Sequence, residues 1–118
     1  MLENKSVREV WQEIEKVMNE IPEPIQGMNV VYQYDITGDD TGTFQLFISG
    51  GTARVVEGNE GTPDCTLKLS DKNFKKMIMG KLNGTAAFMT GKLKIQGSMG
   101  HALKLEGILN EYNLSETE

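Results

Sequence analysis

Between residues 28 and 69, apolar and polar side chains alternate in four short segments separated by turns that contain glycine. Alternation with a period of two is typical of strands that bury one face. The Gly50-Gly51 pair has the length of a tight hairpin between two of the segments. We therefore expect an antiparallel meander of four strands, which lie near residues 28–36, 44–49, 52–57 and 65–69.

Helical spacing replaces alternation on both sides of this block. Residues 7–21 place apolar side chains at intervals of three and four, after a Ser6–Glu9 capping box and before Pro22. Ser70 and Ser98 are candidate N-caps of two later helices. These two helices are expected over 71–80 and 99–112. A short helical turn over 83–90 and a fifth strand over 92–96 are expected between them.

This order of elements predicts an α+β fold, in which helices cover one face of a mostly antiparallel, five-stranded sheet. The opposite face is expected to be solvated or used for pairing. A length of 118 residues suits one domain, 1–118, with its core in 6–112 and a solvated tail in 113–118. The sequence lacks an apolar stretch long enough to span a bilayer and a secretory signal, so we expect a cytoplasmic protein.

Charge is unevenly distributed along the chain. The whole sequence carries −5, but residues 68–104 contain eight lysines and one acid, which leaves −12 on the remainder. The basic segment could meet an anionic membrane surface, the phosphates of a coenzyme A ester or an acidic partner, or it could simply be a solvated face. The acidic total argues against nucleic acid as a partner.

The residue types needed for catalysis are scarce. His101 is the one candidate general base of the usual kind, and Cys65 lies in an apolar alternation that favours a buried core position. Asp39 and Asp40 share a turn but have few other oxygen ligands nearby for calcium. One His and one Cys cannot build a four-ligand zinc site or a disulfide. We expect a binding domain with no catalytic residue, metal or cofactor.

The chain is rich in flexible apolar side chains, including seven methionines. Methionine adapts to variable apolar shapes, so these residues indicate either ordinary core packing or a ligand cavity. The side chains that would line such a cavity are Phe74, Met77, Ile78, Leu82, Phe88, Met89, Met99 and Leu103.

One stretch resembles a known family. Four motifs are similar to those of the sterol carrier protein 2 family of nonspecific lipid-transfer domains. They are Asp64-Cys65-Thr66, Gly80-Lys81-Leu82-Asn83, Ala87-Phe88 and the run from Gly91 to Gly100 (GKLKIQGSMG). The resemblance implies a hydrophobic tunnel between sheet and helices that takes fatty acids, fatty acyl-CoA or sterols without performing chemistry. Close animal relatives carry Gln where this chain has Thr90, which adds Thr90 to the expected ligand contacts.

The resulting hypothesis is a lipid-binding or lipid-transfer module, with fatty acid or fatty acyl-CoA favoured over sterol. The last helix, 99–112, would serve as a lid because Gly97 and Gly100 give its start conformational freedom. The alternative is an interaction or homodimerisation module that uses the sheet face and its edge strands. For a carboxylate or phosphate headgroup, the candidate partners are Lys75, Lys76, Lys81 and Lys92.

Overall fold

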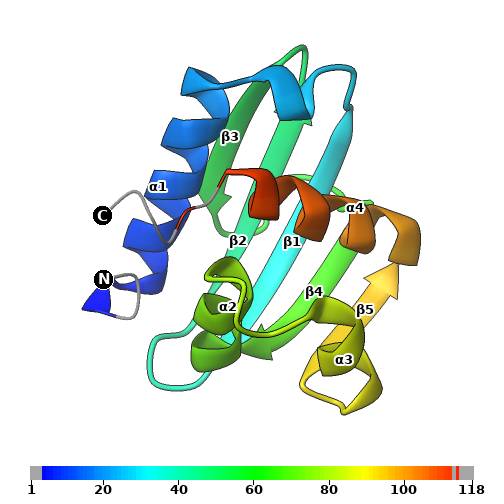
Figure 1. Cartoon of the computed structure of the whole chain (residues 1–118). Coiled ribbons are helices and arrows are strands. Elements are labelled where there is room, and N and C mark those ends of the chain that lie inside the picture. Colours follow the sequence, from blue (N-terminus) through cyan, green and yellow to red (C-terminus); the bar gives the residue numbers. More distant parts are fainter. Residues whose placement is uncertain (1–3, 113, 115–118) are drawn as a thin grey trace.

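A five-stranded sheet carries the helices on one of its faces (Figure 1). The computed structural model describes residues 4–112 and residue 114. This arrangement confirms the expected α+β class and adds a short 3-10 helix, η2, after the first helix. In chain order the elements are α1 (Val7–Glu20), η2 (Glu23–Ile25), β1 (Val30–Thr37), β2 (Gly42–Ser49), β3 (Thr52–Glu57), β4 (Cys65–Ser70), α2 (Asp71–Ile78), α3 (Gly84–Met89), β5 (Leu93–Gly97) and α4 (Met99–Glu111).

The strand order is β3-β2-β1-β4-β5, and three of the four pairings are antiparallel. The exception is the central pair, because β4 lies parallel to β1 with Tyr32 opposite Cys65. The expected four-strand meander is therefore wrong: residues 58–64 form a crossover rather than a hairpin turn. Alternation shows which side chains share a face, but it carries no information on which strand is the neighbour.

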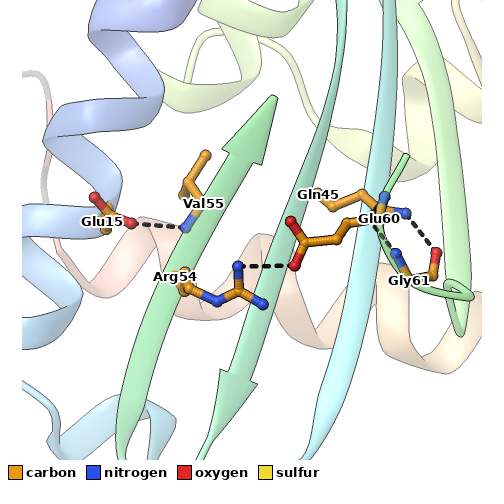
Figure 2. Close-up of polar contacts among 6 residues, drawn as sticks. All are labelled: Glu15, Gln45, Arg54, Val55, Glu60 and Gly61. Atoms are coloured by element: carbon orange, nitrogen blue, oxygen red, sulfur yellow. Dashed lines mark hydrogen bonds and ion pairs between the residues drawn. The ribbon is translucent and has the colours of Figure 1, made fainter. Parts of the chain in front are cut away.

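The crossover passes over the outer face of the sheet, where it is held by the Gln45 side chain (Figure 2). The Gln45 amide oxygen accepts hydrogen bonds from the backbone N–H groups of Glu60 and Gly61, at 2.8 and 2.9 Å. Its amide nitrogen donates to the carbonyl of Gly61 at 2.7 Å and to Gln33 at 2.9 Å. Gln45 is completely buried. This part of the outer face is thus covered, contrary to the expectation of an open face.

We predict that Gln45→Leu lowers the free energy of unfolding by about 3 kcal/mol, because two backbone N–H groups of the crossover lose their buried acceptor. Chemical denaturation of the two proteins measures this difference. Gln96→Leu is the matched control, since Gln96 is exposed on β5 and its loss should change stability by no more than about 0.5 kcal/mol. Equal midpoints for the Gln45 variant and the native chain would contradict this account of the crossover.

The free edge of β3 is occupied by side chains of α1. Asn19 donates to the carbonyl of Ala53 and accepts from its N–H, both at 2.8 Å. Glu15 accepts from the N–H of Val55 at 2.7 Å (Figure 2). An unpaired strand edge is the usual template for pairing with another chain. These side chains remove three of the backbone groups that such pairing would need at this edge.

The core forms where α1 packs against the sheet. Trp11 lies at its centre, with its ring centroid 4.9 Å from that of Tyr34 and 5.2 Å from that of Phe74. The Ser6–Glu9 capping box is present and confirms the predicted helix start. Cys65 is buried, as expected, and burial followed by the nearby charge of Asp64 raises the pKa of its thiol. A neutral thiol at this position behaves as a small apolar side chain.

Candidate functional site

A cavity of about 290 Å³ lies between the sheet and the three C-terminal helices. The sheet forms its floor through Tyr34, Leu67, Leu93 and Ile95. One wall belongs to α2, which contributes Phe74, Met77 and Ile78. This size is close to the lower limit, about 300 Å³, of sites that bury small ligands.

Helices α3 and α4 complete the enclosure. From α3 come Gly84, Thr85, Phe88 and Met89, and from α4 come Met99, Ala102, Leu103, Glu106 and Leu109. Most of these groups are hydrocarbon or thioether. An enclosure of this composition favours an apolar ligand or the apolar part of an amphiphile.

Each of the three helices begins at a side-chain cap. The hydroxyl of Ser70 accepts from the N–H of Asn73 at 3.1 Å, and that of Ser98 accepts from the N–H of His101 at 3.2 Å. Asn83 caps α3 through its side-chain oxygen. Both predicted serine caps are confirmed. The caps fix where the helices start and so set the walls of the cavity.

Helix α4 is anchored near both ends. The Tyr32 hydroxyl donates to the carbonyl of His101 at 2.7 Å, and the Tyr112 hydroxyl donates to the carbonyl of Ile21 at 2.7 Å. Burial raises the pKa of Tyr32 well above its usual value, which keeps this hydroxyl protonated as a donor. These anchors favour α3 over α4 as the movable wall, whereas the sequence indicated α4.

Among the described residues, Glu106 is the charged side chain of the cavity wall. Its carboxylate accepts a hydrogen bond from the backbone N–H of Gly84 and thereby joins α4 to the start of α3. A Cβ atom on Gly84 would lie 2.6 Å from the carboxylate oxygen, so the contact needs glycine there. We call this contact the Glu106–Gly84 clasp.

The sequence-based site residues fall into two groups. Phe74, Met77, Ile78, Phe88, Met89, Met99 and Leu103 line the cavity. Leu82 instead packs half-buried against the core, and the hydroxyl of Thr90 donates to the carbonyl of Ala86 at 2.9 Å. Neither of these two belongs to the lining that the described residues form.

The candidate headgroup lysines lie outside the enclosure. Lys76, Lys81 and Lys92 are exposed and Lys75 is half-buried, and none of them belongs to the cavity lining within the described part of the chain. Sequence reasoning did not select Glu106. Its signal was nevertheless present, since position 106 follows Met99 by seven residues and Leu103 by three, which places it on the same helical face.

Four of the lining side chains also reach the surface. Phe88 is 41% exposed and Met89 is 79% exposed on α3, while Met99 and Leu103 on α4 are 40% and 46% exposed. We call these four residues the apolar rim. Since they contact both the cavity and the solvent, the cavity opens between α3 and α4.

Comparison with known proteins identifies the family to which this fold belongs. Residues 12–110 match the model of the SCP-2 sterol transfer family. The chain belongs to this family. It is 37% identical over 112 residues to hydroxysteroid dehydrogenase-like protein 2 of Xenopus tropicalis, covering 94% of this chain and 26% of that protein. Human sterol carrier protein 2 is 34% identical over 103 residues, covering 84% of this chain and 19% of the relative.

Solved structures of the family share the fold. Sterol carrier protein 2 from Yarrowia lipolytica in its apo form superposes with a TM-score of 0.75 at 29% identity, covering 88% of this chain and 89% of that one. The sterol carrier protein domain 2 of Helicoverpa armigera gives 0.76 at 28% identity, with coverage of 93% and 89%. The chain covers 89% of each of these two solved structures, but only about a quarter of the length of the first curated relatives.

Membership of the SCP-2 family supports lipid binding or transfer as the general function. The helices of residues 4–112 include none with the length and apolar character needed to cross a bilayer.

Proposed function

We propose that this protein binds an amphiphile without catalysis, with a fatty acid or the acyl part of a fatty acyl-CoA in the cavity between α2, α3 and α4. The observation that carries the proposal is the apolar enclosure of about 290 Å³ that opens at the surface. A tail that buries about ten methylene groups gains about 8 kcal/mol before the costs of association.

The charges around the cavity favour a ligand whose headgroup points outward. The Glu106 carboxylate lies in the wall, where it would repel a buried carboxylate or phosphate. Lysines lie outside, with Lys81 before α3 and Lys92 after it. The backbone N–H of Lys92 donates to the carbonyl of Ala87 at 2.8 Å, which places this residue against α3. We assign these two lysines, ahead of Lys75 and Lys76, as the headgroup partners.

The cavity wall offers little for chemistry. Its polar side chains are Tyr34, Thr85 and Glu106, and His101 does not line it in the described structure. Burial raises the pKa of Tyr34 far above its usual value, so its hydroxyl stays neutral. A neutral phenol and a carboxylate engaged in the clasp are poor candidates for a nucleophile and its base.

Native mass spectrometry of the purified protein, followed by organic extraction, tests the proposal. We expect a fatty acid or acyl-CoA in a one-to-one complex, or stoichiometric uptake of a fluorescent fatty acid by lipid-free protein. A protein that is empty, takes up no fatty acid and forms a tight dimer would overturn the proposal in favour of the interaction module. The covered β3 edge and the crossover over the outer face count against that alternative.

A further inference from the structure

The apolar rim is an unusual surface for this chain. Among the described residues, five large apolar side chains are exposed, and four of them form the rim (Phe88, Met89, Met99 and Leu103). The fifth, Ile21, lies at the opposite end of the chain, at the C-cap of α1. Exposed apolar side chains that cluster in this way indicate an interaction site, whereas scattered ones do not.

The charge around the rim is mostly positive, because the one acid that the described residues contribute to the cavity lining, Glu106, is engaged by the backbone N–H of Gly84. Residues 72–105 contain seven lysines and no aspartate or glutamate. Three of these lysines border the rim in sequence: Lys81 precedes α3, Lys92 follows it, and Lys104 is next to Leu103. All three are exposed. The segments that carry the rim are therefore apolar and basic, although the chain as a whole is acidic.

We propose that the apolar rim docks on an anionic bilayer, with Phe88, Met89, Met99 and Leu103 entering the acyl region and Lys81, Lys92 and Lys104 contacting lipid phosphates. The inference rests on the proposed function, because docking in this orientation joins the cavity opening to the hydrocarbon of the membrane. Apolar side chains flanked by lysines are the combination that binds anionic lipid surfaces.

Helix α1 is also amphipathic, but it does not suit docking on an anionic bilayer. Its apolar side chains are buried against the sheet. Its remaining side chains include four glutamates against one arginine and one lysine. An anionic bilayer would repel that net negative charge, so charge complementarity selects the rim.

The first test measures binding of the lipid-free chain to vesicles by co-sedimentation. We expect binding to vesicles that contain phosphatidylserine, weaker binding to pure phosphatidylcholine vesicles, and a loss of binding at high salt. Replacing Lys81, Lys92 or Lys104 singly by glutamine should weaken binding about fivefold. The triple variant Lys81→Gln, Lys92→Gln, Lys104→Gln should weaken it about a hundredfold.

The matched control removes the same charge elsewhere, with Lys5→Gln, Lys16→Gln and Lys68→Gln. These residues lie before α1, on α1 and on β4, and none of them borders the rim. The control triple variant should bind phosphatidylserine vesicles within about twofold of the native chain. Equal losses in the two triple variants would mean nonspecific attraction and would overturn the proposal.

A second variant tests insertion directly. Met89→Trp places a reporter at the most exposed rim position, while the chain's own Trp11 is buried and supplies a constant background. We expect a blue shift on addition of anionic vesicles and quenching by phospholipids brominated in the acyl chain. Unchanged emission, or a rim-dependent dimer without vesicle binding, would overturn docking on a membrane.

Fatty-acid uptake in solution, without vesicles, separates this inference from the proposed function. A chain that takes up fatty acid but ignores anionic vesicles contradicts membrane docking alone. A chain that binds vesicles through the rim but takes up no fatty acid contradicts the proposed function and leaves the docking surface in place.

Discussion

Replacing Met77 by glutamate weakens binding of a fluorescent fatty acid by more than a hundredfold, which corresponds to about 3 kcal/mol. Met77 is half-buried on α2 and its side chain lines the cavity. A carboxylate there must lose its water when an acyl tail enters, and the lining formed by the described residues supplies no cation to replace that water. Fluorescence titration of the variant and the native chain gives the two dissociation constants.

Asn73→Glu is the matched control, because it adds the same charge to the same helix away from the cavity lining. Position 73 is the third residue of α2, after the Ser70 cap, where glutamate is favoured by the helix dipole. This variant should bind fatty acid as the native chain does. Unchanged affinity in a folded Met77→Glu variant would show that the tail does not occupy this cavity.

Glu106→Ala should produce the second large effect, faster opening of α3. The clasp joins the carboxylate to the N–H of Gly84, and a hydrogen bond to a charged group contributes about 1.5–3 kcal/mol. Its loss should raise the rate of amide hydrogen exchange in α3 by about ten- to a hundredfold. Dissociation of bound fatty acid should become faster if α3 is the movable wall, and stopped-flow displacement measures that rate.

Gly84→Ala supplies an independent check of the clasp. The added Cβ would lie 2.6 Å from the Glu106 carboxylate, so the substitution should destabilise the native chain. It should cost much less in the Glu106→Ala background, where that oxygen is absent. Glu111 is exposed on α4, the helix that carries Glu106, so Glu111→Ala controls for the loss of a glutamate from that helix. Additive effects of the two clasp substitutions would contradict direct contact between them.

Helix starts were predictable because a cap is a local feature. Ser6, Ser70 and Ser98 each accept a hydrogen bond from a backbone N–H three residues later, so a few consecutive residues are enough to predict the start of the helix. Strand faces were predictable for a similar reason, since alternation is also local. The side chains that the alternation placed inward on β4, Cys65, Leu67 and Leu69, are buried.

Strand partners were not predictable in the same way. The parallel pairing of β4 with β1 depends on a crossover, and the residue that holds the crossover is a buried glutamine. Gln45 occupies a polar position in the alternation, where a solvated side chain is the ordinary expectation. Its burial follows from contacts with residues 59–61, which are distant in sequence.

The candidate site, too, was predictable from the sequence only in part. Apolar spacing located much of the cavity, because side chains of one helical face share one environment. Lysine content located a basic surface, but long exposed side chains bordering an opening cannot be distinguished by sequence from side chains that line it. Glu106 was missed because a single acid on an apolar helical face breaks the apolar pattern that predicts a cavity lining. In the structure its carboxylate joins α4 to the start of α3.

We expect an acyl tail to occupy the cavity between α2, α3 and α4. Labelling the methionine methyl groups with ¹³C and titrating the chain with a fatty acid tests it most directly. Met77, Met89 and Met99 line the cavity, while Met18 and Met28 are buried in the core and do not. The signals of the first three should shift to a saturating value as fatty acid is added, and those of Met18 and Met28 should stay in place. Fatty-acid binding that leaves the first three unmoved would contradict this expectation.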